Sequence, residues 1–310
     1  MSLVPAGTDM VAALGLGSWL IAVTHDCDFP PEVRALPRVT RSTIAAGASS
    51  GAIDAAVRRA AAVGESTFHL DGEALRAADP EVIVGQTLCA VCAVTLESLP
   101  AAMRARIVPL EATSLDGMFD DLARLAVALG VEERGAALAT SLRIRLEAIR
   151  CAVDGVSRPR VACLEWLDPL FNGGHWVPEQ VALAGGEDVL GRARERSREI
   201  EFAELRRADP DFIVLMPCGF GVERATAEAE LLLSRDDWAA LAAARAGRIY
   251  AVDGASLLQP SGSAADRGSR GARLGAAVGS CRCGAGRVRP PGRVIYSTRQ
   301  LNNRSSKRSR

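Results

Sequence analysis

The chain has 310 residues, of which 48% are hydrophobic and 24% are charged. A chain of this composition can bury a core, so intrinsic disorder is excluded for most of its length. No run of about 18 apolar residues occurs, which excludes a membrane-spanning helix. The first residues contain no basic region followed by an apolar stretch, so we expect no secretory signal in the sequence as it stands.

The formal net charge of zero conceals an asymmetry between the two ends of the chain. Residues 256–310 contain eleven arginines and Lys307 against the single acid Asp266, so this tail carries +11 and residues 1–255 carry −11. A basic tail can bind nucleic acid. We instead expect residues 257–310 to be a disordered, low-complexity end with no nucleic-acid partner.

The chain begins with a predicted strand from Met1 and a helix that ends in glycines at Gly17. Between them we expect residues 5–8 to form a loop, with Thr8 capping a helix that begins at Asp9. The next loop, residues 25–31, reads HDCDFPP. It offers hard and soft metal ligands together, but neighbouring residues cannot all face one ion, so a hydrogen-bonded loop is the preferred interpretation.

Two catalytic motifs sought further along the chain are not supported by the sequence. Residues 47–51 match G-x-S-x-G, but no strand precedes them, so Ser49 or Ser50 is predicted to cap a helix. No Gly-Lys pair exists for a phosphate-binding loop. His69 is predicted to lie in a loop before the next helix. With only His25, His69 and His175 present, no Ser-His-Asp triad can be argued, and we find no constellation that requires catalysis.

An internal repeat is the most informative feature of the sequence. Residues 75–85 read LRAADPEVIVG and residues 205–215 read LRRADPDFIVL, with seven of eleven positions identical at an offset of 130. Each copy predicts a helix end, an Asp-Pro turn and a buried strand. Weaker similarities flank both copies in the same order. A helix ending in glycines precedes each copy, and a short strand follows it. Alternating strands and helices imply parallel sheets, so we predict two similar α/β lobes.

Helical periodicity without a strand signal fills the middle of the chain. One amphipathic helix is predicted over 115–129, closed by Gly130, and a longer one over 132–153. The expected fold is therefore α/β, with two lobes of parallel sheet joined by one long helix. The expected domains are an N-terminal lobe at 1–114, a helical connector at 115–157, a C-terminal lobe at 158–256 and the tail at 257–310.

Eight cysteines in a chain of this length do not indicate a secreted disulfide scaffold. Cys89-x-x-Cys92 and Cys281-x-Cys283 are too few and too irregular for a four-cysteine zinc site. Cys163 lies in an apolar run and is predicted to be part of the core.

Ligands of open α/β sheets bind outside the carboxyl ends of the strands, so we expect the strand-end loops of both lobes to line one cleft. The loop expected at 165–176 holds Trp166 and Trp176, which suit a flat, partly apolar ligand, although either could be core. The candidate ligand-binding residues are Pro5, Ala6, Thr8, His25, Asp26, Cys27, Asp28, Phe29, Gln86, Cys89, Trp166, Asp168, Phe171, His175, Trp176, Cys218 and Phe220.

Several segments together resemble the cobalamin-binding substrate-binding proteins of ABC transporters. They are SLVPAGTDMVAALGLG and VTHDCDFPPEVR in the first half, and CLEWLDPLFNGGHWVPEQVALAGGEDVLG and ADPDFIVLMPCGF in the second. The resemblance covers about residues 2–255. It implies a helical-backbone, class III fold, a corrinoid bound in the cleft, no catalytic cofactor and no metal held by the protein itself. It also implies a monomer that delivers its ligand to a transporter permease, without membrane insertion.

The resemblance ends near Ser256. Relatives continue with an aromatic pair and a Pro-Gly-Pro-Arg stretch, where this chain reads LLQPSGSAADRG. Codons for those twelve residues can be chosen so that the same bases, read one base later, encode YFNRPGPRLTE, the family pattern. We therefore hypothesise a frameshift near codon 256, which comparison of the gene with its relatives would test.

Alternatives to a corrinoid remain open at this point. A ferric siderophore, haem or metal-ion binding protein is the nearest one. A cytosolic metalloenzyme using His25, Asp28, His175 and Glu179 is an alternative of another class. The compartment is also open, because the sequence as written predicts a cytoplasmic protein, whereas relatives are exported and an upstream start codon would allow export.

Overall fold

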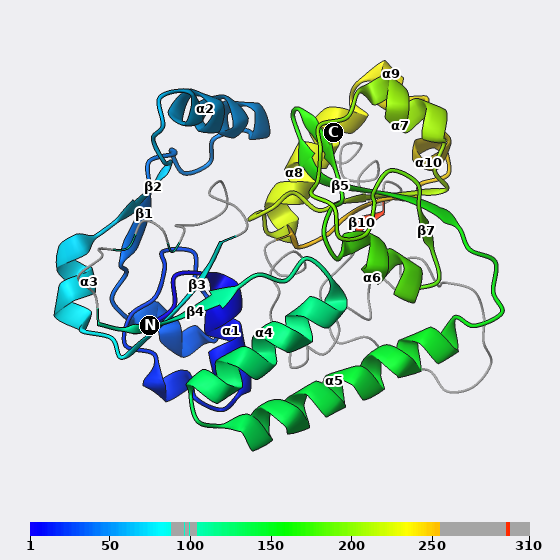
Figure 1. The fold of residues 1–310 in the computed structure, drawn as a ribbon. Coiled ribbons are helices and arrows are strands. Elements are labelled where there is room, and N and C mark those ends of the chain that lie inside the picture. Colours follow the sequence, from blue (N-terminus) through cyan, green and yellow to red (C-terminus); the bar gives the residue numbers. More distant parts are fainter. Residues whose placement is uncertain (88–95, 97–98, 100–103, 255–295, 298–310) are drawn as a thin grey trace, which may run out of the picture. The chain divides into compact units, whose positions relative to one another are not determined.

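The computed structural model describes residues 1–87, 96, 99, 104–254 and 296–297 (Figure 1). The chain divides into two compact units, and the division falls within one long helix. Unit 1 contains the described residues up to Ile144, and unit 2 begins at Arg145. Of the expected basic tail, only Tyr296–Ser297 is described, so the frameshift hypothesis and Cys89 lie outside the described residues.

Unit 1 is built on a parallel sheet whose first strands are very short. Ser2 pairs in parallel with both Val23 and Val84, and Val23 pairs in parallel with Arg38. The bounds in this unit, with α5 running on into unit 2, are α1 Pro5–Ala13, η1 Gly17–Trp19, η2 Pro31–Ala35, β1 Thr40–Ser42, α2 Ser50–Ala62, β2 Phe68–Leu70, α3 Gly72–Ala78, β3 Val82–Gln86, β4 Arg106–Leu110, α4 Leu115–Ala128 and α5 Glu132–Ala152.

Alternate residues of these strands point to opposite faces, as the pleat requires. Val4, Val23 and Val84 join a cluster that includes side chains of α1 and α4. Their neighbours Leu3 and Ile83 join a second cluster that includes Leu75 of α3. Helices thus cover both faces of the sheet, while α2 lies beyond the antiparallel strand pair β1–β2, away from the parallel strands (Figure 1).

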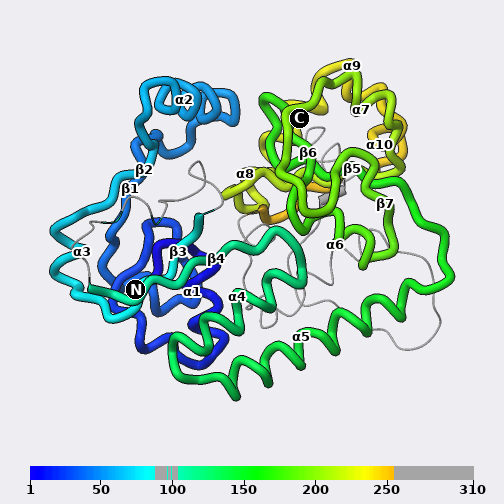
Figure 2. Tube along the Cα trace, viewed as in Figure 1, coloured from blue at the N-terminus to red at the C-terminus, as the bar shows by residue number. Residues whose placement is uncertain are grey.

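Unit 2 has a mixed sheet in the order β10-β9-β8-β5-β6, with β7 also paired to β5. β5 pairs in parallel with β7 and β8, and β8 with β9, whereas β6 and β10 are antiparallel to their neighbours. Figure 2 follows the chain through this unit. The bounds are β5 Arg160–Leu167, β6 Leu170–Asn172, α6 Val177–Leu183, β7 Glu187–Asp188, α7 Phe202–Ala208, β8 Phe212–Leu215, α8 Val222–Leu233, α9 Asp236–Ala239, α10 Ala242–Arg245, β9 Ile249–Ala251 and β10 Tyr296–Ser297.

The two copies of the repeat adopt the same local structure. α3 ends at Asp79 and α7 at Asp209, both in the left-handed conformation, and each is followed by a parallel strand. The glycine-ended helices also match, because Gly15 after α1 and Gly185 after α6 both have positive φ angles, of 77° and 83°. Glycine adopts this conformation without steric cost, which is why it terminates helices.

Four sequence predictions are corrected by the structure. Residues 5–8 are the first turn of α1, because Pro5 at N1 has the φ that a helix needs, so Thr8 lies inside the helix and is not its cap. His69 is a strand residue of β2, paired with Arg41 of the antiparallel strand β1. The loop expected at 165–176 is largely a β-hairpin, since β5 continues to Leu167 and turns into β6.

Other predictions of local structure are confirmed. Ser49 caps α2, its hydroxyl accepting a hydrogen bond from the backbone N–H of Ala52, so the G-x-S-x-G segment is a helix start. α4 is closed by Gly130, which has a φ of 67°, and Cys163 is fully buried. None of the described helices is both long enough and apolar enough to cross a membrane.

Candidate functional site

In unit 1 the candidate residues gather where the parallel strands end. The hydroxyl of Thr8 lies 2.9 Å from the Sγ atom of Cys27, and both side chains are buried. This contact ties the first turn of α1 to the loop that follows Val23. Pro5 is half-buried and Ala6 is buried beside it in the same helical turn.

His25 is held by a network of hydroxyl groups. Its Nδ1 atom lies 2.7 Å from the Oγ1 atom of Thr40, and its backbone N–H donates to the same oxygen at 3.0 Å. The hydroxyl of Thr24 lies 2.8 Å from that of Thr40. The imidazole is 23% exposed, with its Nε2 atom 3.5 Å from a carboxylate oxygen of Asp26. One ring nitrogen is therefore anchored in the protein while the ring keeps access to solvent.

Backbone hydrogen bonds define the shape of this loop. Arg38 donates to the carbonyl oxygens of Thr24 and Cys27, at 2.9 Å and 2.7 Å. Asp26 and Asp28 in this loop are exposed. The hydrogen-bonded loop preferred from the sequence is thus what the structure shows.

The remaining unit 1 candidates lie on the neighbouring strand ends. Phe29 is half-buried, and Gln86 is buried at the end of β3. Beyond it the hydroxyl of Thr87 donates to Glu111, which follows β4, at 3.4 Å. This adds a further carboxylate to the carboxyl edge of the unit 1 sheet.

In unit 2 an aromatic cluster lies at the ends of β5 and β8. The rings of Trp166 and Phe220 meet edge to face, with centroids 5.2 Å apart. The guanidinium of Arg224 lies over the ring of Phe220, 3.5 Å from its centroid. Phe220 is only 2% exposed, whereas Trp166 is half-buried and donates from its indole to the carbonyl of Asp168 at 3.1 Å. The cluster therefore presents the indole of Trp166 and a cation.

The loop that carries Phe220 is fixed to β5 by its backbone. The N–H of Cys218 donates to the carbonyl of Glu165 at 3.0 Å, and the carboxylate of Glu165 accepts from the N–H of Gly174 at 2.7 Å. Cys218 is half-buried and Asp168 is exposed at the hairpin turn. Phe171 is half-buried on β6, where it pairs with Trp166.

His175 and Trp176 are directed into unit 2. Trp176 is 6% exposed, and neither its Nε1 atom nor the Nε2 atom of His175 has a hydrogen-bond partner. The backbone of His175 is held by Glu195 and Arg194 from the following loop, and its φ is 52°. Burial lowers the pKa of His175, with a smaller contribution from Arg196. Trp176 is thus part of the packed interior of the described unit, whereas His175 is half-buried with its Nε2 atom enclosed.

The candidate residues do not form a site for a bare metal ion within either unit. Among the described residues, no group of three or more His, Cys, Asp or Glu side chains is arranged to hold one. Cys27 is also a poor ligand, because burial raises the pKa of its thiol to about 12.

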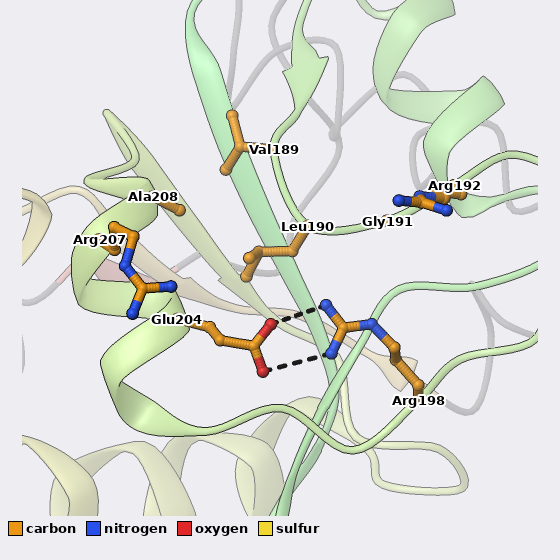
Figure 3. A pocket seen from close by; sticks show the side chains of 8 residues that line it. All are labelled: Val189, Leu190, Gly191, Arg192, Arg198, Glu204, Arg207 and Ala208. Atoms are coloured by element: carbon orange, nitrogen blue, oxygen red, sulfur yellow. Dashed lines mark hydrogen bonds and ion pairs between the residues drawn. The ribbon is translucent and has the colours of Figure 1, made fainter.

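A surface pocket of about 350 Å³ lies elsewhere in unit 2, beside α7 (Figure 3). Glu204 and Arg198 face each other across it and form two hydrogen bonds, at 2.8 Å and 3.3 Å. This pair is neutral, but Arg192 and Arg207 also line the pocket and make its net charge positive. The pocket contains none of the residues predicted from the sequence and is lined by Val189, Leu190, Gly191, Arg192, Arg198, Glu204, Arg207 and Ala208.

Two important residues were missed by sequence reasoning. Arg224 follows Phe220 by four positions at the start of α8, a spacing that could have indicated their contact. Thr40 is fifteen residues from His25, and no local pattern connects them.

The family profile for periplasmic binding proteins matches residues 1–255. The chain belongs to the periplasmic binding protein family. It is therefore a binding protein and not an enzyme, and the α/β fold with parallel sheets is the one predicted. No curated protein sequence matches it significantly.

Solved structures of other periplasmic binding proteins are similar in fold. The apo form of the haem-binding protein RhuT from Roseiflexus sp. RS-1 is 22% identical, with a TM-score of 0.66 over 89% of this chain and 96% of that chain. The vitamin B12 binding protein BtuF of Vibrio cholerae is 19% identical, with a TM-score of 0.63 over 89% and 94%. A protein of an Fe3+-hydroxamate transport system from Saccharomonospora viridis is 20% identical, with a TM-score of 0.62 over 90% and 92%.

Proposed function

We propose that this periplasmic binding protein binds a corrinoid and delivers it to the permease of an ABC importer. The observation that carries the proposal is the cluster of Trp166, Phe220 and Arg224 at the carboxyl ends of β5 and β8. A half-buried indole supported by a buried ring suits a large, flat, partly apolar ligand. The rigid hairpin and loop beneath it hold that surface ready before a ligand arrives.

Carboxylates on the unit 1 loop favour a corrinoid over haem, one of the ligands bound by proteins of similar fold. Asp26 and Asp28 are exposed on the loop of unit 1. Haem carries propionates, which these carboxylates would repel. A corrinoid instead carries neutral side-chain amides, whose N–H groups can donate to carboxylates.

Binding titrations with the three ligand classes test the proposal. We expect aquocobalamin to bind in a 1:1 complex by calorimetry, and haemin and a ferric hydroxamate to bind at least ten times more weakly. Stoichiometric binding of haemin or the hydroxamate, with none of cobalamin, would reject the corrinoid while keeping the family assignment.

A matched pair of tryptophan variants tests the surface itself. Trp166→Ala should weaken corrinoid binding by roughly ten-fold or more, since loss of an aromatic stacking contact costs about 1–1.5 kcal/mol. Trp19→Ala is the control. Trp19 is 59% exposed in η1, beyond the C-terminal end of α1 and so at the opposite edge of the sheet from the candidate residues. Equal effects of the two substitutions would contradict the proposed surface.

A further inference from the structure

We propose that the surface pocket beside α7 binds a small organic phosphate, namely a phosphate monoester with an apolar body. The pocket is separate from the aromatic cluster of unit 2. The N–H of Val189 in its wall donates to the carbonyl of Val161 near the start of β5, whereas Trp166 lies near the end of that strand. Five residues of extended chain span roughly 16 Å, so the two sites can be tested independently.

Two walls of the pocket are held by hydrogen bonds of the backbone. The Oδ1 atom of Asp188 accepts from the N–H groups of Leu190 and Gly191, at 3.0 Å and 2.7 Å. Arg198 is bonded to Asn172 twice, since its N–H donates to the side-chain oxygen at 2.7 Å and its carbonyl accepts from the backbone N–H at 3.1 Å. These walls are in place before a ligand arrives, which lowers the entropic cost of binding.

The third wall is one face of α7 (Figure 3). Glu204, Arg207 and Ala208 are three and four positions apart, so their side chains lie on the same side of the helix. The carboxylate of Glu204 is fully engaged, because it accepts two hydrogen bonds from Arg198 and one from the backbone N–H of Glu201 at 3.1 Å. Glu204 therefore has no acceptor left for the other arginines.

The remaining guanidinium groups are available to an anion. Arg207 is exposed, and among the residues that the structure describes it has no hydrogen-bond or ion-pair partner. Arg192 lies 4.0 Å from Glu195, at the outer limit of an ion pair. Three arginines and one glutamate give the pocket a net charge of +2. A phosphate monoester carries about −1.5 to −2 at pH 7 and matches the planar N–H fork of arginine.

The size and lining of the pocket indicate that the phosphate carries an organic group. A volume of about 350 Å³ holds about twelve water molecules of roughly 30 Å³ each, which is more than a bare phosphate displaces. Val189, Leu190 and Ala208 are half-buried and supply apolar surface. An apolar body attached to the phosphate can pack against these side chains.

The internal repeat shows that the fold does not require the charges of α7. At the offset of 130, Ala77 of α3 stands where α7 has Arg207, and Ala74 stands where it has Glu204. Nevertheless α3 ends in the same left-handed aspartate and leads into an equivalent strand. Arg207 is therefore not needed for the turn, which favours a role in binding.

Calorimetric titration of the full chain with phenyl phosphate at pH 8 tests the proposal. We expect a 1:1 complex, and at least ten-fold weaker binding of phenyl sulfate, which has a similar shape but one negative charge. Arg207→Ala should weaken binding of phenyl phosphate at least ten-fold. Arg206→Ala, on the same helix but outside the pocket lining, is the matched control and should change it less than two-fold. No binding by the wild type, or equal effects of the two substitutions, would overturn the proposal.

Glu204→Gln should have the opposite effect. The substitution removes the competing charge and releases Arg198, while glutamine still suits this position of a capping box. We expect phenyl phosphate to bind at least three-fold more tightly, a gain that misfolding cannot produce. Unchanged or weaker binding would contradict the proposed pocket.

Two measurements locate the site and identify the source of the phosphate. In the unaltered protein, phenyl phosphate should protect Arg207 from phenylglyoxal and leave Arg206 reactive, as read by peptide mass spectrometry. Sedimentation with phosphatidylcholine vesicles that contain phosphatidic acid tests a lipid head group, and we expect Arg207→Ala to leave it unchanged. Loss of vesicle binding in this variant, without binding of phenyl phosphate to the wild type, would overturn the assignment of a free phosphate.

Discussion

Asp79 and Asp209 lie 130 positions apart and have the same φ of 40°, with ψ angles of 60° and 63°. Each occupies the C-cap of a helix and is followed by proline and a parallel strand. An L-residue pays a steric cost in this left-handed conformation, which aspartate tolerates better than most. Retention of the same strained turn in both units indicates that each turn sets the direction in which its strand enters the sheet.

The effect of a substitution at these two turns on the free energy of unfolding should depend on whether the new side chain is branched at Cβ. Asp209→Val is expected to lower the free energy of unfolding by about 1–2 kcal/mol, because a β-branched residue is poorly accommodated at positive φ. Asp209→Gly should be neutral or slightly stabilising, since glycine has no such cost. Thermal unfolding of both variants, and of the same pair at Asp79, measures the difference. Equal stabilities for Gly and Val would show that the turn relaxes and is not constrained by its strand.

The cysteines should differ sharply in reactivity. Burial raises the pKa of the Cys27 thiol to about 12, and that of the fully buried Cys163 is also raised, so at pH 8 both stay protonated. Cys151 is exposed and Cys218 half-buried. We expect iodoacetamide to modify Cys151 and Cys218 in the native protein within minutes, and Cys27 and Cys163 only after denaturation, as peptide mass spectrometry would show. Rapid modification of native Cys27 would contradict the packing of Thr8 against it.

Asp188 should make the stability of unit 2 depend on pH. Its Oδ1 accepts from the N–H groups of Leu190 and Gly191, whereas its Oδ2 is buried without a partner. Burial raises the pKa of Asp188, so the folded state binds this proton more tightly than the unfolded chain does. The contribution of Asp188 to the free energy of unfolding is therefore largest below its ordinary pKa of 3.8. This contribution decreases as the pH rises through the raised pKa of the folded state.

Asp188→Asn removes the charge and should abolish that decrease. We expect the variant to gain on the order of 1 kcal/mol relative to wild type between pH 4 and pH 7, measured by urea unfolding. Glu187→Gln, at the exposed neighbouring position, is the control and should leave the pH profile unchanged. A wild-type profile that rises over this range would show that the two N–H donors outweigh burial.

Two glycines of unit 2 should differ in what they tolerate. A Cβ added at Gly174 would clash with the backbone of Arg196 and Ser197, whereas one at Gly219 meets nothing but requires positive φ. Gly174→Ala should therefore lower the free energy of unfolding by about 2 kcal/mol or more, and Gly219→Ala by about 1 kcal/mol. Chemical denaturation of both variants tests the order, and the reverse order would show that the loop at 196–197 is free to move.

By itself, the sequence determined the order and type of the elements. The repeated helix, Asp-Pro turn and apolar strand at 75–85 and 205–215 are local signals, and so are the glycines that end α1 and α6. The short-range chemistry of these residues is enough to predict parallel α/β units. Where a local signal was ambiguous, as for Pro5 at a helix start or Trp166 in an extended strand, the prediction was wrong by a few residues.

Only the tertiary structure decided which side chains meet. Thr40 holds His25 and Thr8 contacts Cys27 because segments far apart in the chain meet at one edge of the unit 1 sheet. Likewise, only the tertiary structure shows that Trp176 and the Nε2 atom of His175 are buried. The direction of a side chain and its partners depends on packing between segments far apart in the chain, and no local pattern encodes that.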